Sequence, residues 1–533
     1  MRWLRILFFG AMLCGGSAGT AAETAGTHGM IDARDYGAQG DGTTLDTRAI
    51  QAAIDAAAQR GGGEVHLRSG TFLAGTVELR SNVALHLHAG AVLLASTKQA
   101  DFTHRSLVYA EGAENIAVFG RGVLDGHGAL SREFPKVRSH LLHLVNCRNI
   151  TVKDVTLRNS TTWVQHYFRC TNLLVDGITV DSRINPDIEG PRHLSDAPGR
   201  NEDGLNLNSC RQVRVANCRI NSDDDGIVLK STSERPCSNV VISNCVVSSN
   251  ASAVKLGTES GGGFENINVQ NCAIYDTRNA GIALQIVDGG VLDGVNVSNV
   301  TMRNVKGSAI FLRLGNRARP YRAEKPGVGH MRNVIISNVQ ATGVGDWIEA
   351  AGKKVVGCSI TGLPGHAVEN VTLENIRIRF KGGGTLEDAA REVPERPEAY
   401  PACRMFGTLP AYGFYCRHVE NLRFHNVELR FDNDDHRPAV VCEDVQDLNV
   451  FGLDAQSTPS TPAVIWLKQV DGALIHGCRP RQTAGPWLRL DGARSANVSL
   501  INNDLSRVGE VVRIGKEVAR EAVFQGGRFP VSE

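Results

Sequence analysis

Three aspartates stand at corresponding places in two neighbouring segments of the sequence. NEDGLNLNSC begins at Asn201 and SDDDGIVLKS begins at Ser222, and both continue with alternating apolar residues, which is typical of β-strands. Aligned on that alternation, Asp203 falls opposite Asp225, and Asp224 stands beside them. Strands that pair about 4.8 Å apart would hold the three carboxylates close enough to repel one another.

Repulsion among carboxylates raises the pKa of at least one of them, so one can stay protonated while another is ionised. An acid next to a base is what the hydrolysis of a glycosidic bond requires. In an isolated DDDG segment the aspartates would more simply cap a turn, but the alignment over NEDG favours catalysis by Asp203, Asp224 and Asp225. We expect Glu202 and Asp223 to lie behind this set or to face solvent.

The two segments belong to a repeat that recurs along most of the chain. Each copy has a polar residue, usually an asparagine, and then apolar residues that alternate with variable ones, as in SNVVISNCVV. Copies that start at residues 211, 238, 265 and 293 are 27, 27 and 28 residues apart. A short strand repeat of this period indicates a right-handed parallel β-helix, an all-β fold. Wider spacings mark insertions at 183–200, 317–331, 344–364 and 381–415, which we expect to wall a groove on one face.

Stacked rungs place equivalent residues in columns, and two residue types follow such columns. The asparagines expected to form one structural ladder are Asn149, Asn172, Asn239, Asn266, Asn333, Asn370 and Asn421. Eight of the 13 cysteines fall at two fixed positions of the repeat, which predicts stacks of buried free thiols rather than disulfides. The chain has no Cys-x-x-Cys pair, which argues against a zinc site.

The remaining sequence sets the domain plan. Residues 1–22 are typical of a signal peptide, which predicts a secreted or periplasmic protein. Residues 30–110 should form a short N-terminal α/β cap and the first coils, with a helix capped by Thr44 or Asp46 and an apolar face of Ile50, Ile54 and Ala57. Residues 111–515 should form the catalytic β-helix and 516–533 a C-terminal tail. The net charge of +1 and the lack of another long apolar run predict no nucleic-acid or membrane partner, and we expect a monomer.

At the aspartates the chain resembles glycoside hydrolase family 28, the polygalacturonase family. NEDG is similar to its Asn-x-Asp-Gly motif, and Asp224-Asp225-Gly226 is similar to its paired-aspartate motif. The resemblance continues in YGAQGDG, NSTTWVQHYFRC, SITGLPGH and MFGTLPAYGFYCRHV, and the last two segments resemble bacterial members. It implies an inverting hydrolase of an acidic, pectin-type plant polysaccharide, with Asp224 as general acid and Asp203 and Asp225 activating water. It implies no metal or organic cofactor.

The sequence departs from the family pattern at two motifs that contact substrate. Ala251-Ser252-Ala253 stands in place of Gly-His-Gly, and Ala283-Leu284-Gln285 in place of Arg-Ile-Lys. The columns offer replacements, because Lys255 shares a column with Ala283, and Lys230 and Arg313 share one with Gln285 on flanking rungs. We expect these cations to bind an acidic sugar. The alternative is that the lysines only pair with neighbouring acids such as Glu259.

Two further residues should lie one rung before Asp203. Trp163 could stack on a sugar ring, and His166, in the column of Asn206, could bond a hydroxyl. Both could instead pack as wall residues.

Two other functions fit the same residues. A polysaccharide lyase would use the three aspartates to hold Ca²⁺ and Lys230 or Lys255 as the base, and its products would absorb ultraviolet light. A non-catalytic glycan-binding helix is allowed by the two missing motifs. The cluster of like charges argues against it, because binding alone does not need such a cluster.

Overall fold

The computed structural model describes residues 30–127, 139–183, 201–321, 324–349, 352–480 and 483–528. The predicted signal peptide and all but the first residue of the predicted insertion at 183–200 lie outside these ranges. Within the described chain, no helix combines the length and the apolar character needed to cross a membrane.

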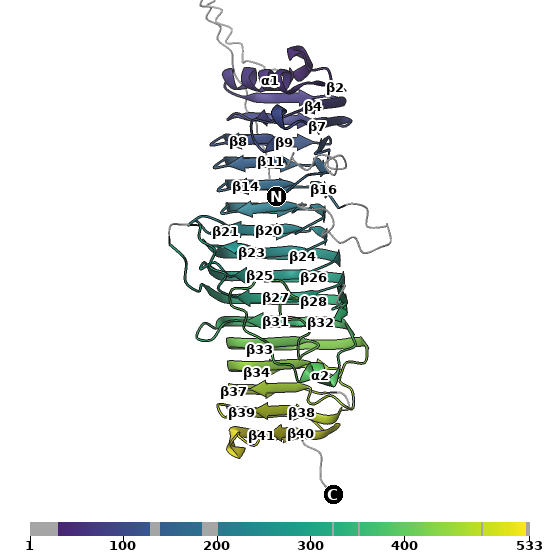
Figure 1. The fold of residues 1–533 in the computed structure, drawn as a ribbon, viewed down its shortest axis with the longest axis vertical. Helices are drawn as coiled ribbons and strands as arrows, with labels where there is room; N and C mark the ends of the chain where they lie inside the picture. The colour runs from purple at the N-terminus through teal and green to yellow at the C-terminus, as the bar shows by residue number, and fades with distance from the viewer. Residues whose placement is uncertain are drawn as a thin grey trace, which may run out of the picture.

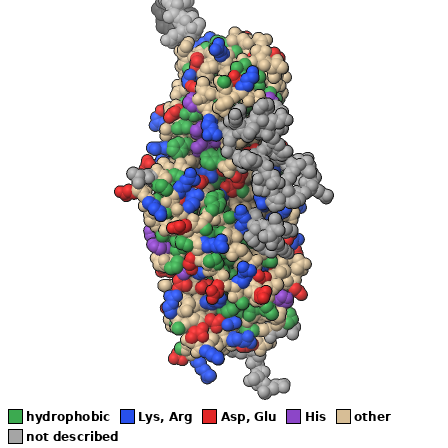
Figure 2. All heavy atoms as spheres, in the orientation of Figure 1, with side chains coloured by type: hydrophobic (Ala, Val, Ile, Leu, Met, Phe, Trp, Pro, Cys, Tyr) green, Lys and Arg blue, Asp and Glu red, His purple; other side chains and the backbone are tan. Residues whose placement is uncertain are grey.

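The protein is a right-handed parallel β-helix, as the repeat predicted, and it is long and narrow in the ribbon view (Figure 1) and in the space-filling view (Figure 2). One turn contains β17 (Leu205–Asn208), β18 (Arg211–Ala216) and β19 (Arg219–Ser222), and each pairs in parallel with its counterpart in the next turn. Within the described residues, an antiparallel strand pair occurs only between β29 (Trp347–Glu349) and β30 (Gly352–Lys354). The regular period of the sequence is therefore the period of the stack.

Three faces run along the helix, and the longest strands bend from one face to the next. The face that carries the aspartates contains β5 (Val77–Glu78), β8 (Ser106–Glu111), β11 (His140–Val145), β14 (Gln165–Phe168), β17, β20 (Ile227–Ser231), β23 (Val254–Ser260), β25 (Ala280–Ile286), β27 (Ser308–Leu314), β31 (Cys358–Thr361), β36 (Ile465–Lys468), β38 (Thr483–Asp491) and β40 (Val508–Ile514). The second face contains β1 (Ile31–Asp32), β3 (Gly63–Leu67), β6 (Val83–Leu87), β9 (Glu114–Gly120), β12 (Arg148–Lys153), β15 (Thr171–Asp176), β18, β21 (Cys237–Ser243), β37 (Asp471–His476), β39 (Ala496–Asp504) and β41 (Val523–Arg528).

The third face contains β2 (Asp41–Leu45), β4 (Gly70–Ala74), β7 (Ala91–Ala95), β10 (Val123–Asp125), β13 (Thr156–Arg158), β16 (Thr179–Asp181), β19, β22 (Val246–Ser249) and β35 (Asp454–Ala455). Strands that span two faces are β24 (Phe264–Thr277), β26 (Val291–Val305), β28 (His330–Val344), β32 (Val368–Gly382) and β34 (Val440–Phe451). Strand β33 (Phe414–Asn433) runs through all three faces. Short helices occur at η1 (Ala33–Tyr36), η2 (Gln99–Asp101), α2 (Leu386–Ala389) and η5 (Arg520–Ala522).

The two ends of the β-helix differ in how closely they follow the prediction. Helix α1 (Thr47–Gln59) covers the N-terminal end (Figure 1), and its predicted apolar face is fully buried. Asp46 occupies the N-cap position but does not cap the helix, because its carboxylate accepts hydrogen bonds from the backbone N–H groups of Gln39 and Gly40. At the other end β41 pairs with β39, so the helix continues past the predicted boundary at residue 515.

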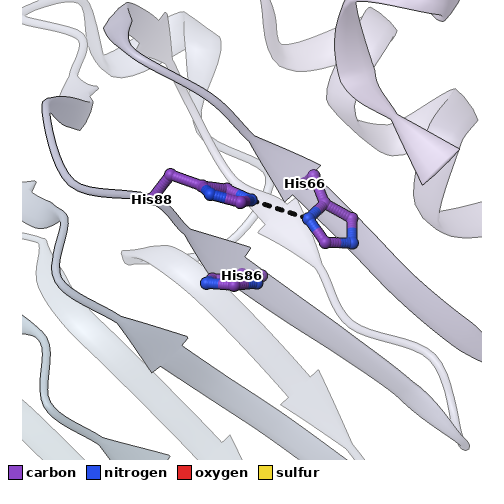
Figure 3. A group of neighbouring side chains, drawn as sticks. All are labelled: His66, His86 and His88. Atoms are coloured by element: carbon purple, nitrogen blue, oxygen red, sulfur yellow. Dashed lines mark hydrogen bonds between the residues drawn. The ribbon is translucent and has the colours of Figure 1, made fainter. Parts of the chain in front are cut away.

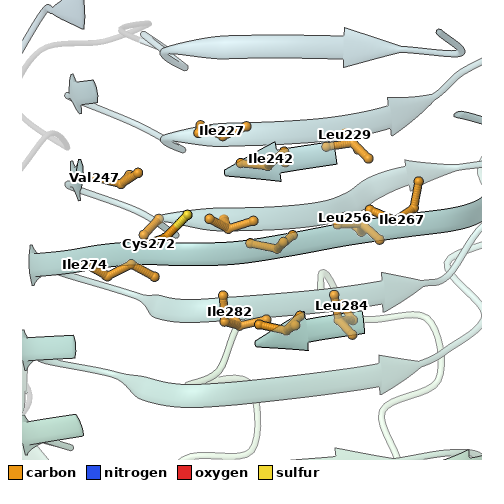
Figure 4. Close-up of a cluster of buried hydrophobic side chains, with 14 of the residues drawn as sticks. Ile227, Leu229, Ile242, Val247, Leu256, Ile267, Cys272, Ile274, Ile282 and Leu284 are labelled. Atoms are coloured by element: carbon orange, nitrogen blue, oxygen red, sulfur yellow. The ribbon is translucent and has the colours of Figure 1, made fainter. Parts of the chain in front are cut away.

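The interior is filled by columns of aliphatic side chains (Figure 4). Leu229, Leu256 and Leu284 stand on successive rungs and are at most 1% exposed. Burying such a side chain contributes about 1.5–3 kcal/mol. The continuous apolar columns fix the register, and the register fixes which polar residues face the outside together.

The predicted asparagine ladder forms in separate runs at a bend of the coil, because Gly294 stands between Asn266 and Asn333, and Asn333 donates to Asp293 instead. Asn172 donates its amide to Asn149 at 2.9 Å and Asn266 donates to Asn239 at 2.8 Å. These asparagines adopt positive φ angles, a conformation that asparagine tolerates better than most residues. Gln212 occupies the place between the two pairs, also at positive φ.

The predicted thiol stacks are confirmed as well. Every cysteine in the described residues is free and buried. The thiols bond to backbone carbonyls of their own or the preceding rung, as when Cys170 donates to Leu144 at 3.3 Å and Cys210 donates to Tyr167 at 3.2 Å. They therefore serve as small core residues.

Candidate active site

The three aspartates come together on the first face, as the alignment predicted. Leu205 pairs with Ile227, and carboxylate oxygens of Asp203, Asp224 and Asp225 lie within 4.8 Å of one another. Asp203 is 1% exposed and Asp225 is 4% exposed, whereas Asp224 is only partly buried. Asp224 is therefore the carboxyl group most open to a ligand.

Local hydrogen bonds hold Asp224 in this position. Its backbone carbonyl accepts from the hydroxyls of Ser222 at 2.9 Å and Ser249 at 2.6 Å. In the amide orientation that satisfies both of its partners, Asn201 donates to the Asp224 carboxyl group and accepts from the indole N–H of Trp163. The asparagine of NEDG thus links the acid to the neighbouring aromatic wall.

Two buried lysines neutralise the other two aspartates. The Nζ of Lys255 lies 2.7 Å from Oδ2 of Asp225, whose Oδ1 accepts from the backbone N–H of Ser252 at 3.0 Å. The Nζ of Lys230 lies 3.4 Å from Oδ2 of Asp203 and 3.0 Å from Glu259. The alternative that these lysines pair with neighbouring acids is therefore what the structure shows, and the partners include the aspartates of the stack.

Burial and mutual repulsion separate the pKa values of the carboxyl groups. Burial, with the charge of Asp225, raises the pKa of Asp203 to about 6, although Lys230 opposes the shift. Burial, with the charges of Asp203 and Asp225, raises the pKa of Asp224 well above its usual value. Burial would raise the pKa of Glu259 too, but Lys230 outweighs it and lowers that pKa to about 2. The site therefore contains one carboxyl group that keeps its proton beside others that lose theirs.

An aromatic wall lies on the rung before Asp203. His166 pairs in register with Asn206, as predicted, and its ring meets Trp163 edge-on at 5.0 Å. Lys230 lies over the Trp163 ring with its Nζ 4.7 Å from the centroid. An open pocket of about 510 Å³ adjoins this wall, and Trp163, Asn201 and His140 are among its lining residues. Burial first, and then the neighbouring histidines and Lys230, lower the pKa of His166, so its ring stays neutral.

Arg313 does not lie where a substrate contact would require. It pairs in register with Gln285 as predicted, but it is 1% exposed, and its guanidinium donates to the carbonyls of Gly362 at 3.1 Å and Glu395 at 2.8 Å. Its bonds instead tie down the insertion at 381–415. Lys230 also differs from the prediction, because a rung carrying Gly257 separates it from Gln285 and the register shifts there.

The insertion at 381–415 supplies a residue that the sequence did not predict. The hydroxyl of Tyr400 lies 3.4 Å from Nζ of Lys255, and its side chain is well exposed. Buried apolar residues of the insertion, such as Phe406, pack on Phe311 of β27. An insertion has no place in the repeat, so its register could not be read. Glu202 and Asp223 are buried, which corrects the option that they face solvent.

The fold and the stacked acids define a β-helical protein of the glycoside-hydrolase type. The model of the family "Glycosyl hydrolases family 28" matches residues 63–397, and the chain belongs to that family of glycoside hydrolases.

Curated relatives are similar over shorter stretches, and a solved structure is similar in fold. A "Probable polygalacturonase" of Vitis vinifera is 29% identical over 225 residues, which is 37% of this chain and 43% of the relative. An "Exo-poly-alpha-D-galacturonosidase" of Dickeya chrysanthemi is 34% identical over 19% of this chain and 20% of the relative. The chain thus spans less than half of these two proteins. An exopolygalacturonase structure from Thermotoga maritima is similar in fold, with a TM-score of 0.58, 20% identity, and coverage of 75% of this chain and 91% of that one.

Proposed function

We propose that this protein is a secreted, metal-independent hydrolase that cleaves glycosidic bonds in pectin-type, galacturonate-containing polysaccharides. The observation that carries the proposal is the difference among the three aspartates: Asp224 is partly exposed and its pKa is raised well above its usual value, beside the buried Asp203 and Asp225. Family membership and the printed activity of the Vitis vinifera relative support it.

The geometry suggests a role for each aspartate. Asp224 donates its proton to the glycosidic oxygen, so the leaving sugar departs as an alcohol. Asp203 accepts a proton from the attacking water, because its carboxylate is ionised above pH 6 and its contact with Lys230, at 3.4 Å, is looser than the one between Lys255 and Asp225. Both oxygens of Asp225 are already bonded, so Asp225 orients the water. The water supplies the hydroxyl group of the new reducing end. Asp203 then releases its proton to solvent, and Asp224 takes one up from solvent.

The paired lysines disfavour the lyase alternative. Lys255 and Lys230 already bring positive charge to Asp225 and Asp203, so a Ca²⁺ ion there would meet two buried ammonium groups. A lysine whose pKa is raised by a carboxylate is also a poor base, and Asp225 raises the pKa of Lys255 despite its burial.

Substrate recognition is proposed from the side chains that surround the three aspartates. Trp163 offers a ring face for a sugar, with His166 supporting its edge. Lys255 uses one N–H on Asp225 and points toward Tyr400, so the two together can bind a uronate carboxylate. Lys230 acts through Asp203 and Trp163. The insertion at 381–415 covers the rungs that follow the aspartates, which favours attack near a chain end.

The test is a product assay with homogalacturonan, rhamnogalacturonan and their oligomers in EDTA, following reducing ends and ultraviolet absorbance. Wild type should release short products as new reducing ends without absorbance, and Asp224→Asn should lose about 10²–10⁴ of the rate. Asp223→Asn is the matched control, because Asp223 bonds Asn250 at 2.6 Å behind the stack, and it should keep most activity. Products that absorb ultraviolet light would indicate a lyase, and a lack of activity on every substrate would contradict the proposal.

The first product of the same reaction shows whether cleavage inverts or retains the anomeric configuration. The family resemblance implies inversion, yet the carboxylate oxygens lie within 4.8 Å, whereas carboxyl groups of inverting enzymes are typically about 6.5–9.5 Å apart. We propose inversion, because Asp225 has both oxygens occupied and Asp203 is buried, so neither is placed as a nucleophile. Proton NMR of the first product should show the inverted anomer. A retained anomer would assign a covalent intermediate to one of them.

A further inference from the structure

A second cluster of titratable side chains lies far from the aspartates, near the N-terminal end of the helix. His66 on β3 pairs in register with His86 on β6, and His88 follows β6 directly. Figure 3 shows the three rings gathered together, with His66 and His88 joined by a hydrogen bond of 2.7 Å. Glu64, two residues before His66 on the same strand, lies beside them.

Two ring nitrogens in this cluster are buried and lack a partner. Nε2 of His66 and Nδ1 of His86 make no hydrogen bond within the described structure, although each is a strong polar group. The Glu64 carboxylate approaches both, with Oε2 3.5 Å from Nε2 of His66 and 3.9 Å from Nδ1 of His86. Buried polar atoms normally have partners, so these three atoms converge on a place where a partner is missing.

We propose that His66, His86 and Glu64 bind a divalent transition-metal ion, and that Zn²⁺ fits this donor set. Two donors that sit about 2.1 Å from one tetrahedral ion are roughly 3.4 Å apart, close to the separations of Glu64 from the two histidines. Two histidines and one glutamate form a recognised zinc donor set. Water can complete the coordination from the exposed side, where the Glu64 side chain is 52% accessible.

His88 fits the role of a positioning residue. When Nδ1–H of His66 donates to Nε2 of His88, the lone pair of His66 is left on Nε2, which faces Glu64. Histidines that bind metals usually donate their other N–H in this way.

The other histidine cluster, His140, His143 and His166, is a weaker candidate. The rings of His143 and His166 stack with 11° between their planes, so their nitrogens do not point at one ion. The rings of His66 and His86 are tilted by 47°. The positive charge of Arg68 near His66 is balanced by its 2.7 Å bond to Asp32. This inference revises the expectation, drawn from the missing Cys-x-x-Cys pair, that the chain has no zinc site.

The test is calorimetric titration of tag-free, EDTA-treated protein with Zn²⁺, and with Mg²⁺ as a negative control. Wild type should bind one Zn²⁺ that His86→Gln loses. Glu64→Gln should bind at least tenfold more weakly, and His88→Phe about 10–100-fold more weakly. His143→Gln and His330→Gln are matched controls and should bind like wild type. Substitution by Co²⁺ should give a visible absorption band that His86→Gln lacks.

A thermal readout separates metal binding from a folding defect. Without metal, Glu64→Gln should have the same melting temperature as wild type, because the Glu64 side chain is half exposed. Zn²⁺ should raise the melting temperature of wild type more than that of the variant, since a ligand that binds the native state stabilises it. The proposal is overturned if wild type binds no Zn²⁺, if His86→Gln binds it equally well, or if His143→Gln is the variant that loses it.

Discussion

The asparagine ladder and the aspartate stack are built in the same way but have opposite effects. In both, adjacent rungs place like residues side by side. Asn266 and Asn239 are neutral and exposed, and each amide satisfies the next at 2.8 Å. Asp203 and Asp225 are buried carboxyl groups, and a column of such groups is unfavourable unless cations accompany it. Repeated amides therefore stabilise a parallel β-helix, whereas repeated carboxylates make it reactive.

Two buried lysines offset the repulsion within the aspartate stack. Lys255 and Lys230 are each 4% exposed and bond to Asp225 and Asp203. No corresponding cation is needed in the ladder, because an amide donates and accepts at once. Removing a lysine should therefore damage the stack in a way that no single change can damage the ladder.

The largest effect is expected from Lys255→Met, which keeps the length of the side chain and removes its charge. Breaking a buried ion pair on one side typically costs about 3–5 kcal/mol, and the uncompensated Asp225 would also disturb the ionisation of Asp203. Denaturant unfolding should show this loss, and turnover should fall by about 10²-fold or more. Lys153→Met is the control, since its 3.8 Å pair with Asp176 is far more exposed than the pair of Lys255, and a surface pair is worth about 0–1 kcal/mol. Equal losses in the two variants would contradict the account.

The next effect is on pH dependence. The folded pKa of Asp203 is raised to about 6, so the base becomes protonated as the pH falls through that value, and kcat/KM should drop tenfold per pH unit below it. Lys230 lowers this pKa, so Lys230→Met should move the acidic limb to higher pH. A limb near pH 4 in wild type would show that Asp203 is not the base.

The smallest effect is expected in the ladder. Asn266→Ala removes one amide bond and places alanine at a φ of 53°, which should cost about 1–2 kcal/mol and leave activity unchanged. Asn266→Gly keeps the permitted backbone and loses only the bond, so it should cost less. A loss of activity in either variant would mean that the two columns are not independent.

The sequence predicted most where its repeat is regular. The pairing of Leu205 with Ile227 follows from the alternation of apolar residues, and that register alone brings Asp203 to Asp225. The same reasoning placed His166 against Asn206 and Lys255 against Ala283. These predictions hold because a one-residue shift would expose the whole apolar column.

The sequence did not predict side-chain positions where the chain leaves the repeat, or where the orientation of a side chain depends on residues distant in the sequence. Tyr400 stands in an insertion whose path the repeat does not define. Arg313 occupies its predicted column, but carbonyls of that insertion hold its guanidinium. His66 and His86 belong to the first coils, where Asn82 begins the strand of His86 but Gly62 takes the corresponding place before the strand of His66, so the repeat did not reveal their pairing. Asp46 bonds the preceding turn rather than its own helix.

The central claim is that Asp224 alone supplies the proton, and a leaving-group comparison tests it most directly. An aryl oligogalacturonide with a dinitrophenyl leaving group needs no protonation, whereas natural oligogalacturonide does. The account predicts that Asp224→Asn retains much of the wild-type rate on the aryl substrate while it loses about 10²–10⁴ on the natural one, and that Asp203→Asn loses both. Equal losses on both substrates in Asp224→Asn would contradict it.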